Sequence, residues 1–262
     1  MIDSLIEDVL FGARVRKIGV KDSEIHTQRG KVQVEYENNS GFRKTLESDY
    51  LILAIPYTSL RSIEKTRKFA PKQEMAIREV RYVEVTKILL QYRKRWWEKI
   101  FCENEQGLDG GLVSDLPIRY TMFPKTKSND QFKNSSRGVI MAAYTFEQDA
   151  TILGALPPYR QIQTAAENLH RIFPDAKSLD LLEAGASQVF PSDEWAGGSA
   201  FCYFGPTQKT NYLPAMCATD WEERCFFAGE QASFTHGWIH GAFEAGLRCV
   251  QQVSDAHKVK PQ

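Results

Sequence analysis

A segment near the end of the chain, from Phe226 to Arg248, constrains the fold more than any other part of the sequence. It begins with a short apolar run that the pair Gly229-Glu230 interrupts. Small residues then recur at helical spacing: Ala242, Ala245, Gly246 and Cys249. This order predicts a buried strand, a polar turn, and a helix that packs close to another backbone or to a flat ligand.

The start of that helix has a chemical consequence of its own. The helix is expected to begin near Trp238, just after Gly237. The N–H groups of a first helical turn lack partners within the helix, and the helix dipole places partial positive charge there. The segment therefore suits an electron-rich acceptor group of a ligand.

The overall charge argues against binding of nucleic acid or anionic lipid through a general electrostatic field. Lys plus Arg and Asp plus Glu both number 33, so the formal net charge is zero. A neutral chain has no general field that attracts nucleic acid or anionic lipid. With 262 residues, 42% hydrophobic and 25% charged, we expect a soluble globular chain with one large domain or two small ones.

Neither a disulfide framework nor a metal site is indicated. The five cysteines are scattered without CxxC spacing: Cys102, Cys202, Cys217, Cys225 and Cys249. His236 and His240 stand four apart but lack a third ligand, so we expect no metal. No apolar run approaches the roughly 20 residues of a membrane helix, and the first residues include Asp3, Glu7 and Asp8 in place of a basic run, so we expect no leader among them. A cytoplasmic location without membrane contact is expected.

Taken as a whole, the segment from Phe226 to Arg248 resembles the C-terminal FAD motif of the flavin amine oxidases, closest to their L-amino-acid oxidase branch. In that family the acidic residue of the Gly-Glu pair contacts the ribityl-diphosphate part of FAD, and the Gly-Trp turn lies beside the flavin. The resemblance therefore implies cofactor contacts at Gly229, Glu230, Gly237, Trp238 and Ile239. The alternative is an ordinary surface turn, with Trp238 as a core residue.

Strands near the start of the chain extend the resemblance. Apolar or alternating runs predict strands at 15–20, 31–36 and 50–56, the last one fully buried. In the family, a strand equivalent to Ala13-Arg14-Val15 places a valine backbone against the adenine of FAD. Val15 is thus a candidate adenine contact. A β-branched residue that simply occupies a strand is the equal alternative.

Lys87 lies inside a predicted strand at 83–92, which follows a predicted helix at 71–81. A lysine in an apolar strand must reach solvent, form a pair or serve a function. The family match implies a place near the flavin N5, where the lysine holds a water during proton transfer or oxygen reduction. An edge-strand lysine that reaches solvent is the alternative.

Two further segments carry candidate substrate contacts. The run from Gly138 to Phe146 predicts a buried strand in which Tyr144 and Phe146 share a face. In L-amino-acid oxidases a tyrosine at this place hydrogen-bonds the substrate carboxylate, and an apolar residue two positions on lines the side-chain pocket. The alternative for Tyr144 is an aromatic core residue. Ser199 and Phe201 are candidate pocket walls, but they depart from the family pattern, which leaves the preferred substrate side chain open.

The N-terminal fingerprint of the family is absent from this sequence. A flavin amine oxidase normally begins with a βαβ unit that carries GxGxxG, and no such motif lies between Met1 and Gln262. Met1 to Leu5 resembles a point well inside family sequences, where the chain passes the flavin. The resemblance therefore covers roughly the C-terminal half of such an enzyme.

An α+β fold is expected, with three functional segments. Residues 1–56 would belong to the FAD-binding domain, and residues 57–220 to a substrate-binding domain with a mixed β-sheet flanked by helices, one of them at 157–173. Residues 221–262 would supply the C-terminal strand and helix of the Rossmann-like FAD-binding domain.

The activity that the resemblance implies is that of a flavin-dependent L-amino-acid oxidase. A hydride would pass from the substrate Cα to flavin N5, water would hydrolyse the imine, and O2 would reoxidise the flavin to give H2O2. Lys87, Tyr144 and Trp238 would be the catalytic residues, with Trp238 as a cavity wall. The alternatives are a monoamine or polyamine oxidase, and a non-catalytic assembly module. A homo-oligomer or a separate N-terminal FAD-binding chain is the expected protein partner.

Overall fold

The computed structural model describes residues 8–21, 30–101, 110–124 and 135–258. Cys102 and the segment from Met1 to Leu5 that resembles a flavin-passing stretch lie outside the described residues. The chain forms two compact units, Met1–Tyr82 with Phe201–Gln262, and Val83–Ala200. The predicted functional segments change at residues 56 and 220 instead. Their assignment to FAD or to substrate stays a prediction.

A four-stranded sheet of the first unit has the strand order β3-β2-β1-β5. The strands are β1 (Arg14–Lys21), β2 (Lys31–Glu37), β3 (Arg43–Ser48) and β5 (Glu64–Lys65). Ile18 and Val32 are buried on one face, whereas β3 is exposed along its whole length. The strands predicted at 15–20 and 31–36 are confirmed. β3 escapes prediction because an exposed polar strand has no apolar alternation.

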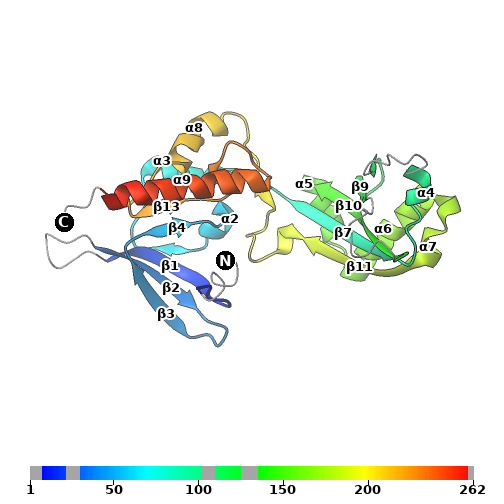
Figure 1. Ribbon diagram of the computed structural model, residues 1–262, viewed down its shortest axis with the longest axis horizontal. Helices are drawn as coiled ribbons and strands as arrows, with labels where there is room; N and C mark the ends of the chain where they lie inside the picture. The colour runs from blue at the N-terminus through cyan, green and yellow to red at the C-terminus, as the bar shows by residue number, and fades with distance from the viewer. Residues whose placement is uncertain (1–7, 22–29, 102–109, 125–134, 259–262) are drawn as a thin grey trace. The chain divides into compact units, whose positions relative to one another are not determined.

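A parallel strand pair lies beneath the longest helix of this unit. β4 (Leu51–Leu53) pairs with β13 (Cys225–Phe227), and α9 (Ile239–Lys258) runs along β13 (Figure 1). The short helix η3 (Glu230–Ala232) and a turn connect β13 to α9. All three residues of β13 are buried, as expected of a parallel strand that is covered on both faces.

β13 links two apolar clusters because its successive side chains point in opposite directions. Phe226 packs with Cys249 and Ala256 of α9. Phe227 belongs to the larger cluster, where its ring lies 5.2 Å from Phe69 and 6.3 Å from Tyr57. The helices α2 (Tyr57–Leu60), α3 (Pro71–Glu79) and α8 (Gln208–Met216) belong to the same unit.

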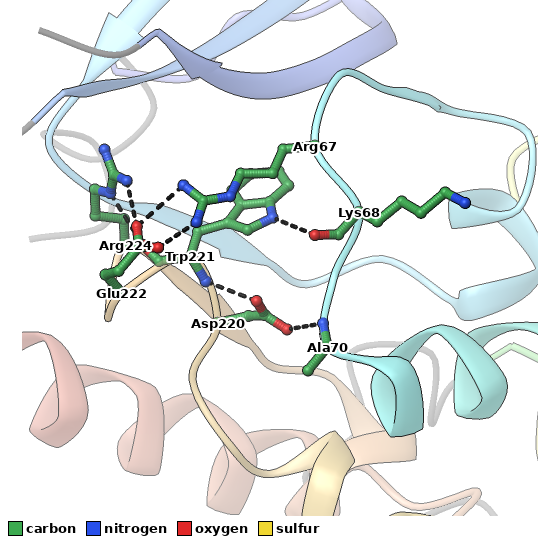
Figure 2. A network of polar contacts seen from close by, with 7 residues as sticks. All are labelled: Arg67, Lys68, Ala70, Asp220, Trp221, Glu222 and Arg224. Atoms are coloured by element: carbon green, nitrogen blue, oxygen red, sulfur yellow. Dashed lines mark hydrogen bonds and ion pairs between the residues drawn. The ribbon is translucent and has the colours of Figure 1, made fainter.

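A polar clasp fixes the turn before β13 (Figure 2). We use "clasp" for residues 67–70 and 220–224. The carboxylate of Asp220 accepts the N–H of Ala70 at 2.8 Å and that of Trp221 at 2.7 Å. The buried Trp221 stacks on Phe69 at 4.7 Å and donates from Nε1 to the carbonyl of Lys68 at 3.3 Å. The clasp therefore joins two segments that lie far apart in the sequence.

Backbone strain is concentrated in the same turn. Trp221, Glu222 and Glu223 have φ values of 51°, 50° and 60°, which is the left-handed region. Such a conformation costs a non-glycine residue about 1–2 kcal/mol. Two arginines offset this cost, since Arg67 and the buried Arg224 both form ion pairs with Glu222 (Figure 2). Arg224 also donates from Nε to the carbonyl of Trp221 at 2.9 Å.

The second unit is built on a five-stranded sheet in the order β11-β7-β10-β9-β8. The ladders between these strands are antiparallel. The strands are β7 (Val85–Tyr92), β8 (Gly110–Val113), β9 (Tyr120–Phe123), β10 (Gly138–Phe146) and β11 (Leu182–Val189). The two-residue strands β6 (Tyr82–Val83) and β12 (Phe201–Cys202) pair where the chain passes between units.

Helices cover one face of this sheet. α5 (Glu147–Gly154) and α6 (Pro158–Ile172) pack on it, and α6 buries Ala165, Ala166 and Leu169. These residues share one apolar cluster with Ile88 and Leu90 of β7. The remaining short helices of the unit are α4 (Glu98–Phe101), η1 (Pro174–Ala176), α7 (Ser178–Leu181) and η2 (Phe190–Ser192). The other face carries the alternate residues of β7, among them Lys87.

The α+β class is confirmed, and so are the predicted helices near 71–81 and 157–173 and the strands near 83–92 and 138–146. The small-residue stripe of α9 is partly wrong. Ala245 and Cys249 are buried, but Ala242 is exposed, and a Cβ on Gly246 would meet nothing within 4 Å. Gly241 makes the close approach instead. None of the described helices combines the length and apolar character needed to cross a membrane.

Replacement of Asp220 by alanine is expected to lower the free energy of unfolding by about 1–3 kcal/mol, because two backbone N–H groups lose their acceptor. Urea denaturation measures this. The matched control is Asp255→Ala, which removes an exposed ion pair with Lys258 and exposed hydrogen bonds from Gln251, and should cost at most about 1 kcal/mol. Equal losses in the two variants would contradict the clasp.

Two glycines of α9 allow a second matched test. A Cβ on Gly241 would lie 2.0 Å from the carbonyl oxygen of Thr235, so Gly241→Ala must displace the turn and destabilise the protein. Gly246→Ala enters open space and is expected to stabilise the helix by about 0.5–1 kcal/mol. Thermal denaturation compares them. A Gly241→Ala variant as stable as Gly246→Ala would refute the close approach.

Candidate functional site

The predicted site residues fall into two groups, one in each unit. The first unit holds Val15, Phe201, Gly229, Glu230, Gly237, Trp238 and Ile239. The second unit holds Lys87, Tyr144, Phe146 and Ser199. Each group is described within its own unit.

The turn between β13 and α9 is held by the carboxylate of Glu230. One of its oxygens accepts the N–H of Cys202 at 2.7 Å, and the other accepts the N–H of Gly237 at 2.9 Å. Burial raises the pKa of Glu230, and the two backbone N–H groups partly oppose that rise. Gly229 and Gly237 have φ values of 96° and 73°, a region that glycine adopts without strain.

The residues at the start of α9 are open to solvent. Trp238 is 67% exposed, so the alternative of a core tryptophan is wrong. Ile239 opens the helix, which agrees with the predicted start near Trp238. No acidic side chain lies in the first turn of this 20-residue helix, so its N–H groups and dipole are not neutralised by its own sequence. This end of the helix fits an electron-rich ligand edge.

Arg248 anchors α9 to the end of β13. Its guanidinium donates to the carbonyl of Ala232 at 2.7 Å and to that of Phe227 at 2.9 Å. In the sequence, Arg248 is the last residue of the motif, and no role was predicted for it. A basic residue among small residues, on a helix that follows a strand-turn motif, was the available signal. Such a residue can bind the carbonyl groups that a strand leaves free at its end.

His236 and Ser233 also shape this turn and were not assigned that role from sequence. The His236 ring nitrogen Nε2 lies 3.0 Å from the carbonyl of Ser233, and its ring meets Phe204 at 4.3 Å. Burial lowers the pKa of His236. Ser233 Oγ accepts the N–H of Thr235 at 3.1 Å. Among the described residues, no three His, Cys, Asp or Glu side chains gather as a metal site.

Val15 lies on β1 at an irregular point of the ladder. The register with β2 shifts between Val15 and Lys17, which takes Arg16 out of the pairing. The ladder with β5 covers Lys17 and Ile18. A β-bulge removes backbone groups from regular pairing, so a ligand contact by the backbone near Val15 is feasible here.

Lys87 and Tyr144 face each other across neighbouring strands of the second unit. The Lys87 Nζ lies 4.8 Å from the centre of the Tyr144 ring and 5.9 Å from that of Phe190. β7 is an interior strand, between β11 and β10, so the alternative of an edge-strand lysine is wrong. A cation at this distance from aromatic faces is attracted to them. Phe190 was not predicted to belong to this group.

Tyr144 stands beside Phe146, as their shared strand face predicts. The two ring centres are 4.5 Å apart. Burial raises the pKa of Tyr144, so its hydroxyl stays protonated at neutral pH and can donate a hydrogen bond. A hydroxyl donor beside a lysine and an apolar ring can bind a carboxylate whose neighbouring group is apolar.

The two candidate wall residues differ in exposure. Ser199 is buried. Phe201 is partly buried, and a Cβ on Gly237 would lie 3.1 Å from its ring. The first unit thus brings Phe201 and the Gly237 turn together, whereas the pocket role of Ser199 stays a prediction.

Comparison with known proteins identifies relatives. The family described as flavin containing amine oxidoreductase matches residues 1–254. The putative L-amino-acid oxidase YobN of Bacillus subtilis (strain 168) is 28% identical over 256 residues, 97% of this chain and 49% of the relative. The flavin-dependent L-tryptophan oxidase RebO of Lentzea aerocolonigenes is 28% identical over 255 residues, 97% of this chain and 50% of that protein. An L-amino-acid oxidase of Echis ocellatus is 30% identical over 269 residues, which cover 99% of this chain and 48% of that protein.

Solved structures agree on the fold. Cyclohexylamine oxidase from Brevibacterium oxydans IH-35A has a TM-score of 0.70 at 18% identity, over 99% of this chain and 51% of that chain. A putrescine oxidase with a redesigned cofactor site has a TM-score of 0.71 at 18% identity, with the same coverage of 99% and 51%. At this identity the likeness concerns the fold alone.

The chain spans about half the length of the curated relatives it matches. Within that half, the match is continuous over nearly all of the 262 residues and includes the strand, Gly-Glu turn and helix that the sequence singled out. The chain belongs to the flavin containing amine oxidoreductase family.

Proposed function

We propose that this chain supplies the substrate-binding and cofactor-edge elements of an FAD-dependent L-amino-acid oxidase. The observation that supports this most directly is the cross-strand pair of Lys87 and Tyr144, with Phe146 beside it. A bound FAD would supply the redox chemistry, a two-electron oxidation of the amino acid to an imine that water hydrolyses, with O2 as the final acceptor reduced to H2O2. The protein residues position the reactants.

The turn residues of the first unit fit a flavin cofactor. The free end of α9 is open, lacks acidic residues in its first turn and follows the exposed Gly237. These features suit the electron-rich edge of an isoalloxazine ring. Glu230 would face the ribityl chain, with one oxygen lone pair left on each carboxylate oxygen for a further donor. The backbone at the Val15 bulge would face the adenine.

Tyr144 and Lys87 would have separate roles in the second unit, one toward the substrate and one toward a water molecule. The Tyr144 hydroxyl would donate to the substrate carboxylate, and Phe146 would contact the substrate side chain. The Lys87 ammonium, held over the Tyr144 ring, would keep a water in place for proton transfer. Trp238, which is exposed, and Phe201 would be substrate-wall residues of the first unit, and Ser199 would be a substrate-wall residue of the second unit.

An amine without a carboxylate is the second candidate substrate. The rings of Tyr144 and Phe190 lie beside Lys87 and Phe146 packs on Tyr144, so the surroundings are aromatic, and aromatic faces attract cationic ammonium groups. Two structural neighbours are named as putrescine oxidase and cyclohexylamine oxidase. The third reading is a non-catalytic assembly module that keeps the fold without FAD.

Tyr144→Phe separates the two substrate classes in the FAD-loaded assembly. The substitution removes one hydrogen bond to a charged group, so kcat/KM for an L-amino acid is expected to fall about 10- to 100-fold. The amine that lacks only the carboxylate should be oxidised as before. Steady-state O2 consumption with both substrates measures this. Equal losses on the acid and the amine would remove the carboxylate role.

A protein partner is proposed for the outward face of α9. Ile239, Phe243, Leu247 and Val250 recur at spacings of four, four and three residues and are between 63% and 78% exposed. They lie on one side of the helix, away from the buried Ala245 and Cys249. Exposed apolar stripes of this kind mark interaction sites. We assign this face to an N-terminal FAD-binding half, since the relatives are about twice as long as this chain.

The proposed partner face predicts dye binding by the isolated 262-residue chain. The chain should bind the apolar dye ANS or self-associate, and Phe243→Glu with Leu247→Glu should reduce both several-fold. The control, His240→Glu with Gln251→Glu, adds the same charge to exposed polar positions of α9 and should change neither. A wild-type monomer at high dilution that binds no dye would contradict the proposed interface.

A further inference from the structure

Glu230 joins two parts of the first unit that the sequence separates. Its carboxylate accepts one N–H from Cys202 of β12 and one from Gly237, at 2.7 Å and 2.9 Å. Cys202 precedes Glu230 by 28 residues, and Gly237 follows it by 7. Both carboxylate oxygens are therefore engaged by backbone groups of the protein itself.

We propose that Glu230 is a positioning residue whose carboxylate fastens the Gly237–Trp238 turn to β12, and so fixes Trp238 relative to Phe201. This role is separate from the predicted ribityl contact. The statement that Trp238 and Phe201 are cavity walls rests on the proposed function. The fastening itself rests on the geometry of Glu230.

The packing around the turn requires a fixed distance. Gly237 has a φ of 73°, and a Cβ added to it would lie 3.1 Å from the Phe201 ring. The backbone of the turn therefore lies directly on that ring. Trp238 follows Gly237 immediately and precedes the first residue of α9. A small shift of the turn would thus move Trp238 and the open end of α9 together.

The charge on Glu230 strengthens the link. None of the ion pairs between described residues involves Glu230, so backbone N–H groups, and not a cation, stabilise its carboxylate. Hydrogen bonds to an ionised acceptor are about twice as strong as neutral ones. A protonated carboxyl keeps one good acceptor oxygen, and its other oxygen becomes a donor. Protonation of Glu230 therefore breaks one of its two links.

Three other titratable groups lie near Glu230 and must be told apart from it. Cys202 and Tyr82 interact with the carboxylate electrostatically, and burial raises the pKa of each far above neutral. They are uncharged wherever Glu230 titrates. His236, on the same turn, has a pKa lowered by burial. A signal from His236 would persist after removal of Glu230, which separates the two groups.

The first test is amide hydrogen exchange by NMR on the full chain with Glu230→Gln. Glutamine keeps the size of the side chain but has one acceptor oxygen instead of two. Exchange at Cys202 or Gly237 is expected to accelerate roughly tenfold or more. Glu244→Gln, an exposed change of the same chemistry on α9, should leave both amides protected. Unchanged protection of both amides in Glu230→Gln would overturn the proposal.

The second test needs no variant to fold. In the wild type, the amide chemical shifts of Cys202 and Gly237 should follow one common titration, with a midpoint above the ordinary pKa of glutamate because burial raises the pKa of Glu230. Separate midpoints, or no titration, would overturn the link. Both tests stand even if the chain oxidises no substrate.

The wall assignment has its own readout in the FAD-loaded assembly. At saturating FAD, Glu230→Gln is expected to raise KM for amino acids with large side chains more than for those with small ones, with a lesser effect on kcat. A uniform loss across side-chain sizes would overturn the wall assignment. A failure of this test with accelerated amide exchange would leave the fastening in place and count against the proposed function.

Discussion

The junction between β13 and α9 depends on two partly buried charged side chains, one of which binds backbone carbonyl groups and the other backbone N–H groups. Arg248 donates hydrogen bonds to the carbonyl groups of Phe227, at the end of β13, and of Ala232, at the end of η3. Glu230 accepts hydrogen bonds from the N–H groups of Cys202 and Gly237. A turn buried on one side must find partners for such groups, because a buried unpaired backbone group is costly. The open end of α9 keeps its position because these neighbouring backbone groups are bonded.

In the second unit, a lysine lies inside a sheet and forms no ion pair with an acidic side chain of the described residues. Lys87 lies on an interior strand, where its ammonium rests on the faces of Tyr144 and Phe190. The antiparallel register sets this pair, since a slip by one residue would turn one of the two side chains to the helix-covered face. This one register therefore positions both Tyr144, the proposed hydrogen-bond donor to the substrate carboxylate, and Lys87, the proposed ligand of a water molecule.

Much of the fold could be predicted from the sequence because its elements carry a strong apolar period. β1, β2, β7, β10, α6 and α9 are of this kind. β11 was not predicted, because its sequence Leu-Glu-Ala-Gly-Ala-Ser-Gln-Val is poor in β-forming residues and its pairing with β7 is non-local. The clasp was missed for a related reason, since Ala70 and Asp220 are 150 positions apart. Local patterns contain no information on such contacts.

Less of the candidate site than of the fold could be predicted from residue patterns alone. The roles proposed for Lys87, Tyr144 and Glu230 came from a family resemblance, and patterns of residue type alone favoured none of them over a structural role. The structure adds the contacts that the resemblance lacked, such as Phe190 beside Lys87 and Cys202 beside Glu230. These partners join residues that only the folded chain brings together, so sequence spacing could not indicate them.

We propose that this half of the fold serves an FAD-dependent oxidation of L-amino acids. The most direct measurement is the visible absorbance of the chain with FAD, first alone and then with an N-terminal FAD-binding half encoded in the same genome. The assembled protein is expected to show flavin absorbance that bleaches under nitrogen when an L-amino acid is added. A protein that stays colourless in both states, or flavin that no L-amino acid reduces, would contradict it.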